Sequence, residues 1–67
     1  MKITINRTPE EHTGEFLTVR QIWDSKGWNF PLLIVRVDGM FVERRDYETT
    51  LVRDGAEVDV IHLMSGG

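Results

Sequence analysis

The chain begins with a regular alternation of apolar and polar residues. Ile3 and Ile5 fall on one side of an extended segment and polar residues fall on the other, so residues 1–6 are predicted to form a strand with one buried face. A short return strand is expected at residues 11–13. Pro9 would confine this strand to the edge of a sheet, because proline has no amide hydrogen to donate to a second neighbour.

Towards the other end of the chain, the pattern predicts a strand that is apolar on both faces. Val58 and Val60 lie on one face, and Ile61 and Leu63 lie with Asp59 on the other. Strands with two apolar faces are typical of the middle of a sheet. We therefore expect this strand to be central and to run parallel to the first strand.

Between these two strands, the pattern predicts a helix followed by a hairpin. Thr18 and Gln21 have the spacing of a capping box and Gly27 is a typical helix stop, which gives a helix of about two to three turns. Asp38-Gly39 favours a type I′ turn between two strand-like runs.

The remaining apolar residues are assigned to the core and to short connecting elements. Trp23 and at least one of Trp28 and Phe30 are expected to pack in the core rather than to form a ligand platform. A single helical turn is expected at residues 43–46, and a short strand at residues 49–52.

This order of elements predicts an α+β fold of the β-grasp type, a mixed sheet of roughly four to five strands with one main helix on one face. The other face of the sheet would stay open. On it we expect Ile34, Arg36, Asp59, Ile61 and Leu63. Apolar side chains on adjacent strands form a contiguous patch there, so we expect a docking surface for a partner protein, to which Met64 would add.

Composition narrows the possible functions. The chain has 67 residues, a formal net charge of −3 and no cysteine. One small domain over residues 1–67, with a flexible tail at 65–67, is expected to leave little room for a deep active-site pocket. The negative charge disfavours nucleic acid and anionic membranes as partners, and the lack of cysteine excludes disulfides and a thiol nucleophile. No signal peptide or membrane span is visible, so we expect a cytoplasmic protein that is monomeric on its own.

Candidate catalytic groups are few. His12 and His62 have no third ligand at metal spacing. Ser65 has no base positioned by the local sequence, which argues against a hydrolase, and there is no glycine-rich phosphate loop. We therefore expect no metal, no bound cofactor and no catalysis by the chain itself.

The chain ends in Ser65, Gly66 and Gly67, which have almost no side chain to pack and are expected to be flexible and exposed. Glycine has no Cβ, so a terminal Gly-Gly can thread a narrow channel in another protein. A carboxylate that reacts with ATP in a partner's active site would benefit from this access. The chain has no nucleotide site of its own, so Gly67 is predicted to be the group on which a partner enzyme acts.

Several segments spread along the whole chain match a known family in their order and spacing: residues 1–6, 37–42, 51–58 and 60–62 and the terminal Gly66-Gly67. On these segments the chain resembles the ThiS/MoaD sulfur-carrier family of ubiquitin-like β-grasp proteins. The resemblance implies that an E1-like enzyme of the ThiF/MoeB type uses ATP to adenylate the carboxylate of Gly67. Sulfur supplied ultimately by a cysteine desulfurase would then give a thiocarboxylate, which donates the sulfur in cofactor synthesis.

The branch of this family is a separate question. Residues 42–47 are similar to a Val-Pro-Arg-x-x-Trp-like segment of thiamine carriers, with Glu43 in place of the proline and Tyr47 in place of the tryptophan. Ser65 is also at home in the molybdopterin branch. The resemblance favours a donor of sulfur to thiazole synthase. The alternatives are a donor to the large subunit of molybdopterin synthase, a ubiquitin-like protein modifier, and an interaction module whose Gly-Gly is incidental.

Overall fold

The structure is a computed structural model that describes residues 1–28 and 33–62, except for the side chains of Leu33 and His62. Its elements, in chain order, are β1 (Lys2–Ile5), β2 (Thr8–Glu11), β3 (Phe16–Thr18), α1 (Val19–Lys26), β4 (Leu33–Val37), β5 (Met40–Val42), the 3₁₀ helix η1 (Arg44–Asp46), β6 (Leu51–Arg53) and β7 (Glu57–His62).

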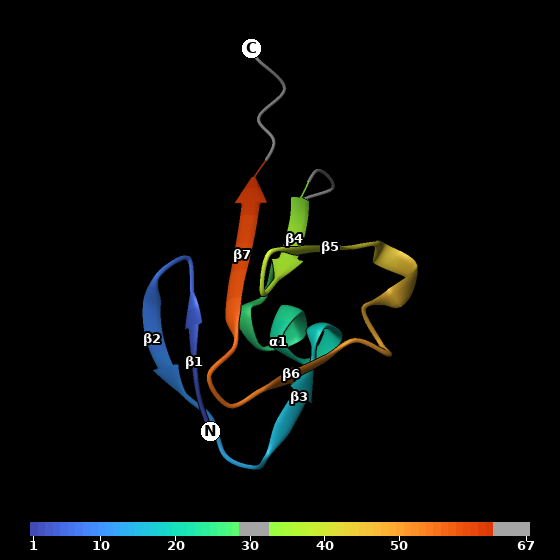
Figure 1. Ribbon diagram of the computed structural model, residues 1–67. Coiled ribbons are helices and arrows are strands. Elements are labelled where there is room, and N and C mark those ends of the chain that lie inside the picture. Colours follow the sequence, from blue (N-terminus) through green and yellow to red (C-terminus); the bar gives the residue numbers. More distant parts are fainter. Residues whose placement is uncertain (29–32, 63–67) are drawn as a thin grey trace.

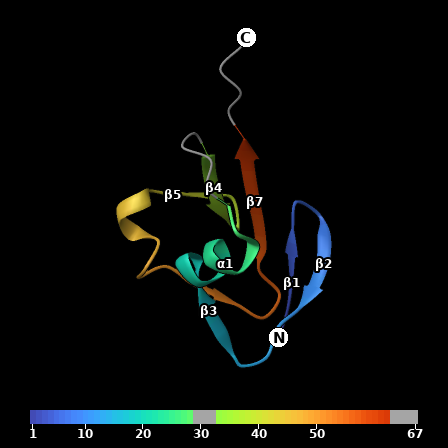
Figure 2. The ribbon, with the colours of Figure 1, turned by 180° about the vertical axis from the view of Figure 1, so that it is seen from behind.

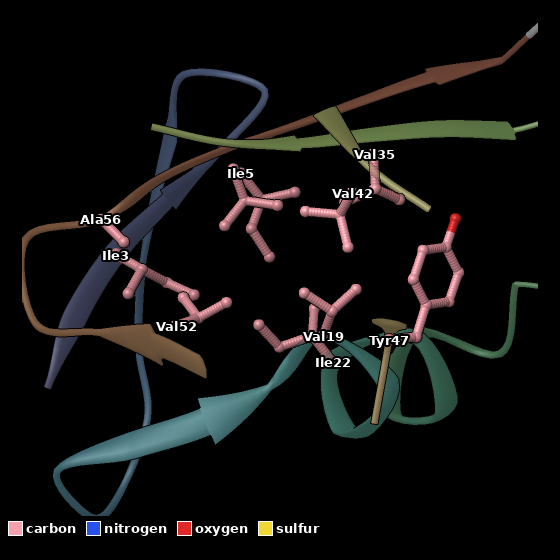
Figure 3. Close-up of a cluster of buried hydrophobic side chains, with 10 residues drawn as sticks. Ile3, Ile5, Val19, Ile22, Val35, Val42, Tyr47, Val52 and Ala56 are labelled. Atoms are coloured by element: carbon pink, nitrogen blue, oxygen red, sulfur yellow. The ribbon is translucent and has the colours of Figure 1, made fainter. Parts of the chain in front are cut away.

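The main sheet has five strands in the order β2-β1-β7-β4-β5 (Figure 1). β7 lies in the middle and runs parallel to β1, whereas the other neighbouring pairs of this sheet are antiparallel. The helix α1 covers one face of the sheet, and the core lies between them (Figure 2 and Figure 3). The predicted β-grasp fold with a central last strand is therefore confirmed.

The return strand β2 lies earlier in the chain than predicted. It spans Thr8–Glu11 rather than residues 11–13, because Asn6 and Arg7 form a tight turn with φ of 50° and 69° and the chain reverses at once. β2 is an edge strand, as Pro9 predicts.

A second sheet contains two strands, β3 and β6, paired antiparallel. β6 is close to the short strand predicted at residues 49–52, but β3 was not predicted. It has only three residues, and its partner strand lies far along the chain, so local alternation does not reveal it. Leu17 of β3 lies opposite Val52, whose side chain is completely buried at 0% exposure.

The helix α1 has the two ends that the sequence predicts. The Thr18 hydroxyl accepts a hydrogen bond from the amide of Gln21 at 3.1 Å, and the Gln21 side chain accepts one from the amide of Thr18 at 2.8 Å. Gly27 ends the helix in the left-handed region with φ of 67°. The helix buries Val19 and Ile22 against the sheet.

The hairpin of β4 and β5 turns at Asp38 and Gly39, which have φ of 50° and 82°. Positive φ at both central residues is the requirement of a type I′ turn, so this prediction is confirmed. The single helical turn predicted at residues 43–46 is also present, as η1.

Among the described side chains, ten make up the buried core, and nine of them are labelled in Figure 3. They are Ile3, Ile5, Val19, Ile22, Val35, Val42, Tyr47, Val52, Ala56 and Val58. Trp23 and Trp28 pack against this core and meet edge to face, with ring centroids 5.6 Å apart. The expectation that Trp23 and a second aromatic side chain pack in the core is met in part, because Trp23 and Trp28 are only partly buried and pack against it. Phe30 lies outside the described residues.

Candidate functional site

The pairing of β4 with β7 decides which side chains reach the open face of the sheet. Val35 points to the helix side and is 1% exposed. The residues on either side of it point the other way, so Ile34 lies opposite Ile61 and Arg36 lies opposite Asp59. Ile61 is 38% exposed, which makes it one of the large apolar side chains on the surface.

The open face also has a polar part. A hollow of about 390 Å³ is lined by Thr4, Arg7, Arg36, Glu57 and Asp59. Within it, Nη2 of Arg36 lies 3.7 Å from Oδ2 of Asp59, a loose ion pair between two partly exposed side chains. The face therefore combines an apolar part around the two isoleucines with a polar part that carries charges of both signs.

Phe41, which was not among the residues predicted for this face, extends its apolar part. It lies opposite Arg36 and is therefore on the same face, where it is 61% exposed. The signal was present in the sequence, because a two-residue turn at Asp38 and Gly39 places Phe41 opposite Arg36, a residue already expected on the open face. Phe41 and Ile34 lie on adjacent strands of the sheet, β5 and β4.

Side chains just beyond the ends of β1 and β4 hold the backbone of β7 in place. Oδ1 of Asn6 accepts a hydrogen bond from the amide of Val60 at 2.8 Å. Oδ1 of Asp38 accepts one from the amide of Glu57 at 2.9 Å. These bonds fix the position of β7 along its neighbours and so fix which of its residues face outwards.

The structure brings together four of the residues predicted for the open face. Ile34 lies beside Ile61, and Arg36 lies beside Asp59, as their alternation predicts. Their role in binding a partner stays a prediction. The other predicted site residues, Leu63, Met64, Ser65, Gly66 and Gly67, lie outside the described residues.

The groups with shifted pKa values lie away from the open face. A hydrogen bond from Lys26 lowers the pKa of Glu10, and a contact with His12, 3.2 Å away, acts in the same direction against partial burial. Burial raises the pKa of Tyr47, and Arg44 opposes part of that rise. Among residues 1–28 and 33–62, no group of histidine and acidic side chains could hold a metal ion. No helix in that part of the chain is long and apolar enough to cross a membrane.

Comparison with known proteins identifies the family. The chain is similar to the thiamine biosynthesis protein (ThiS) from Geobacter metallireducens, with 29% sequence identity. The crystal structure of that protein matches with a TM-score of 0.87 over 100% of both chains. Its NMR solution structure matches with a TM-score of 0.79 over 100% of this chain and 88% of the other. The comparison with curated proteins gives no match. The family model of the ThiS family matches residues 3–67, and the chain therefore belongs to the ThiS family.

Proposed function

We propose that this protein is a sulfur carrier that supplies the sulfur for the thiazole ring of thiamine. The observation that carries the proposal is the family match, which runs from residue 3 to residue 67 and so includes the terminal Gly66-Gly67. The likeness to a thiamine biosynthesis protein favours the thiamine branch over the molybdopterin branch.

The reacting group would be the carboxylate of Gly67. A carboxylate is a poor electrophile, and attack by its oxygen on the α-phosphorus of ATP would release pyrophosphate and leave an acyl adenylate. Sulfide would then attack the carbonyl carbon, displace AMP and leave the thiocarboxylate. A persulfide derived from a cysteine desulfurase would displace AMP to give an acyl disulfide, and a thiol would have to reduce its S–S bond to release the thiocarboxylate. An E1-like enzyme would bind the ATP, so the chain itself is a protein co-substrate and not an enzyme.

Glycine at the last two positions suits this chemistry. Neither residue has a Cβ, so the tail can pass through a narrow channel to the nucleotide of the partner. The cysteine-free sequence also suits it, because the transferred sulfur would be carried on Gly67 and no thiol of the chain would compete for it. Thiazole synthase would be the acceptor of the sulfur.

Intact-mass spectrometry tests the carrier reaction. The protein is incubated with ATP, a sulfide source and an E1-like enzyme that has been shown to activate another carrier. We expect the mass increase of one oxygen replaced by sulfur, localised to Gly67 by fragmentation. The matched control is a chain without Gly66 and Gly67, which should stay unmodified. An unmodified full-length chain beside an active enzyme would reject the proposal.

The open face would be the surface that docks on the activating enzyme. Ile34, Phe41 and Ile61 supply apolar area next to the charged pair of Arg36 and Asp59. Apolar patches rimmed by polar residues are typical of protein interaction sites.

The docking surface is tested with Ile61→Asp. We expect this change to slow formation of the adenylate at least about tenfold, which corresponds to a loss of about 1.4 kcal/mol in binding. Phe16→Asp is the control, because Phe16 is also exposed, at 50%, but belongs to β3 of the other sheet. Equal rates for the two variants would contradict docking on the open face.

A further inference from the structure

The two edges of the main sheet differ in how they are protected. β2, at one edge, contains Pro9 and two acidic residues, Glu10 and Glu11. Proline and charged side chains on an edge strand are the usual means of preventing another strand from pairing with it. β5, at the other edge, has the sequence Met-Phe-Val and contains neither. Its edge is therefore the one that can accept a further strand.

The geometry of the hairpin directs the backbone of Phe41 towards this free edge. Met40 pairs with Val37 across the two-residue turn of Asp38 and Gly39. In such a hairpin the pair next to the turn exchanges both backbone hydrogen bonds, and the next residue points its N–H and C=O away from the partner strand. That next residue is Phe41.

A hollow lies beside β5 and completes the site. It has a volume of about 320 Å³, and it is lined by Val37, Asp38, Met40, Phe41, Val42, Asp46 and Thr50. Met40 is 73% exposed at its rim, on the face of β5 opposite to Phe41. A strand added to β5 would thus place alternate side chains towards the hollow and towards Phe41.

The charge of the hollow indicates what would enter it. Asp38 and Asp46 both line it, and within the described part of the chain neither carboxylate takes part in a salt bridge. Oδ1 of Asp38 accepts a hydrogen bond from the amide of Glu57, so Oδ2 of Asp38 is available to a ligand. Two carboxylates above an apolar floor are complementary to the long apolar stem and charged end of a lysine or arginine.

We propose that the free edge of β5 binds an extended segment of a partner protein by strand addition. The segment carries a lysine or arginine that enters the hollow between Asp38 and Asp46, and an apolar residue opposite Phe41. This inference does not rest on the carrier function proposed above, because it uses no residue of the C-terminal tail. It shares Phe41 with the docking surface proposed for the open face. The mode of binding is β-augmentation, in which backbone hydrogen bonds give affinity and alternate side chains give specificity.

A second copy of the chain is a poorer occupant of this edge. Self-pairing about Phe41 would join only the three residues of β5 from each copy, well below the area of a stable dimer. It would also bring together two chains that each carry a net charge of −3, without placing a cation in either hollow.

An NMR titration of the ¹⁵N-labelled protein tests the proposal. The probe is a synthetic peptide with acetyl and amide ends, Thr-Lys-Val-Lys-Val-Lys-Thr, whose lysines fall on one side of a strand and valines on the other. We expect saturable shifts that are largest at the amides of Gly39, Phe41 and Glu43. A peptide with glutamate in place of lysine should bind at least about tenfold more weakly.

Backbone methylation of the peptide separates strand addition from attraction between charges. In an added strand, the residue opposite Phe41 has its side chain on the same face as Phe41. The N–H of that residue points towards β5. N-methylation of the valines should therefore abolish the shifts, whereas N-methylation of the lysines should leave them. Equal effects of the two methylations would overturn the proposal, as would the absence of saturable shifts.

Variants of the protein test the role of the hollow. Asp46→Asn should weaken binding of the lysine peptide about threefold to tenfold, because one of the two carboxylates is lost. Glu48→Gln removes the same charge from an exposed position that does not line the hollow, and it should leave binding unchanged. Equal weakening by both variants, shifts centred on Ile34 and Ile61, or shifts that follow protein concentration without peptide would each overturn the proposal.

Discussion

The two faces of β4 and β7 are made from alternate residues of the same strands, yet they have opposite properties. On the helix side, Val35 and Val58 are 1% and 2% exposed. On the open side, Ile61 is 38% exposed and the side chain of Arg36 is 45% exposed. A slip of one residue in the pairing would exchange the two sets. The register that builds the core therefore also builds the candidate docking surface, and the two can be tested against each other.

The largest loss of unfolding free energy is expected from a change on the helix side, Val58→Asp. This change places an unpaired carboxylate among the core side chains, which costs more than about 4 kcal/mol of unfolding free energy. A chain of this size has a total stability of roughly 3–10 kcal/mol, so most of the variant should be unfolded. Urea denaturation followed by circular dichroism measures the loss.

Ile61→Asp is the matched control on the other face of the same strand. Because Ile61 already contacts water, the variant should stay within about 1 kcal/mol of the parent protein. Unfolding of this variant would show that the open face contributes to the core and would contradict the assignment of the two faces.

Truncation of a side chain to alanine should also affect stability differently on the two faces. Val35→Ala removes two methyl groups from a buried site and should lower the free energy of unfolding by about 2 kcal/mol. Ile34→Ala removes more carbon atoms from the open face, and mainly loses the contact with Ile61 across the strands, about 0.2–1 kcal/mol. Chemical denaturation of both variants measures the two losses of unfolding free energy. A greater loss for Ile34→Ala than for Val35→Ala would contradict the assignment of the two faces.

The sequence predicted the elements whose signals are local. The capping box of Thr18 and Gln21, the stop at Gly27 and the turn of Asp38 and Gly39 each depend on residues within a few positions, and all of them are confirmed. The central place of β7 was predicted from its apolar residues on both faces, a pattern typical of strands in the middle of a sheet, and it is confirmed.

What the sequence did not predict depends on residues far apart or on exact register. β3 has three residues and exists because β6 pairs with it, a contact that no local pattern reveals. The start of β2 depends on two consecutive residues with positive φ, Asn6 and Arg7, of which only the asparagine is a typical turn former. Phe41 was missed for another reason, since the alternation of β5 was not carried across the turn to the open face.

An ion pair between Glu10 and Lys26 lies on the helix side of the sheet, and it predicts how the stability of the fold depends on pH. Glu10 lies opposite Ile3 and so points to the helix side, where it contacts Lys26 and His12. Because Lys26 lowers the pKa of Glu10 in the folded protein, the pair stabilises the fold above the unfolded pKa of the carboxyl group. This contribution is lost as the pH falls through the lower, folded pKa.

The expected size is less than about 1 kcal/mol, because both partners are partly exposed. It is measured as the difference in unfolding free energy between the parent protein and Glu10→Gln, at pH 7 and again below the folded pKa. The difference should shrink as the pH falls. A difference that grows in acid would mean that Glu10 is destabilising when ionised.

The smallest effect is expected for the ion pair on the open face, Arg36 with Asp59. Their atoms are 3.7 Å apart, and 45% and 35% of the two side chains are exposed, so water screens the attraction. A double-mutant cycle with Arg36→Gln and Asp59→Asn should give a coupling free energy below about 0.5 kcal/mol. A coupling above about 1 kcal/mol would make the pair a structural element of the sheet. If the coupling is weak, Arg36 and Asp59 can separate and pair with charged groups of a docked protein, and little free energy is lost when their own ion pair breaks. Binding to the open face would then cost less free energy than binding to a face whose ion pairs stabilise the fold.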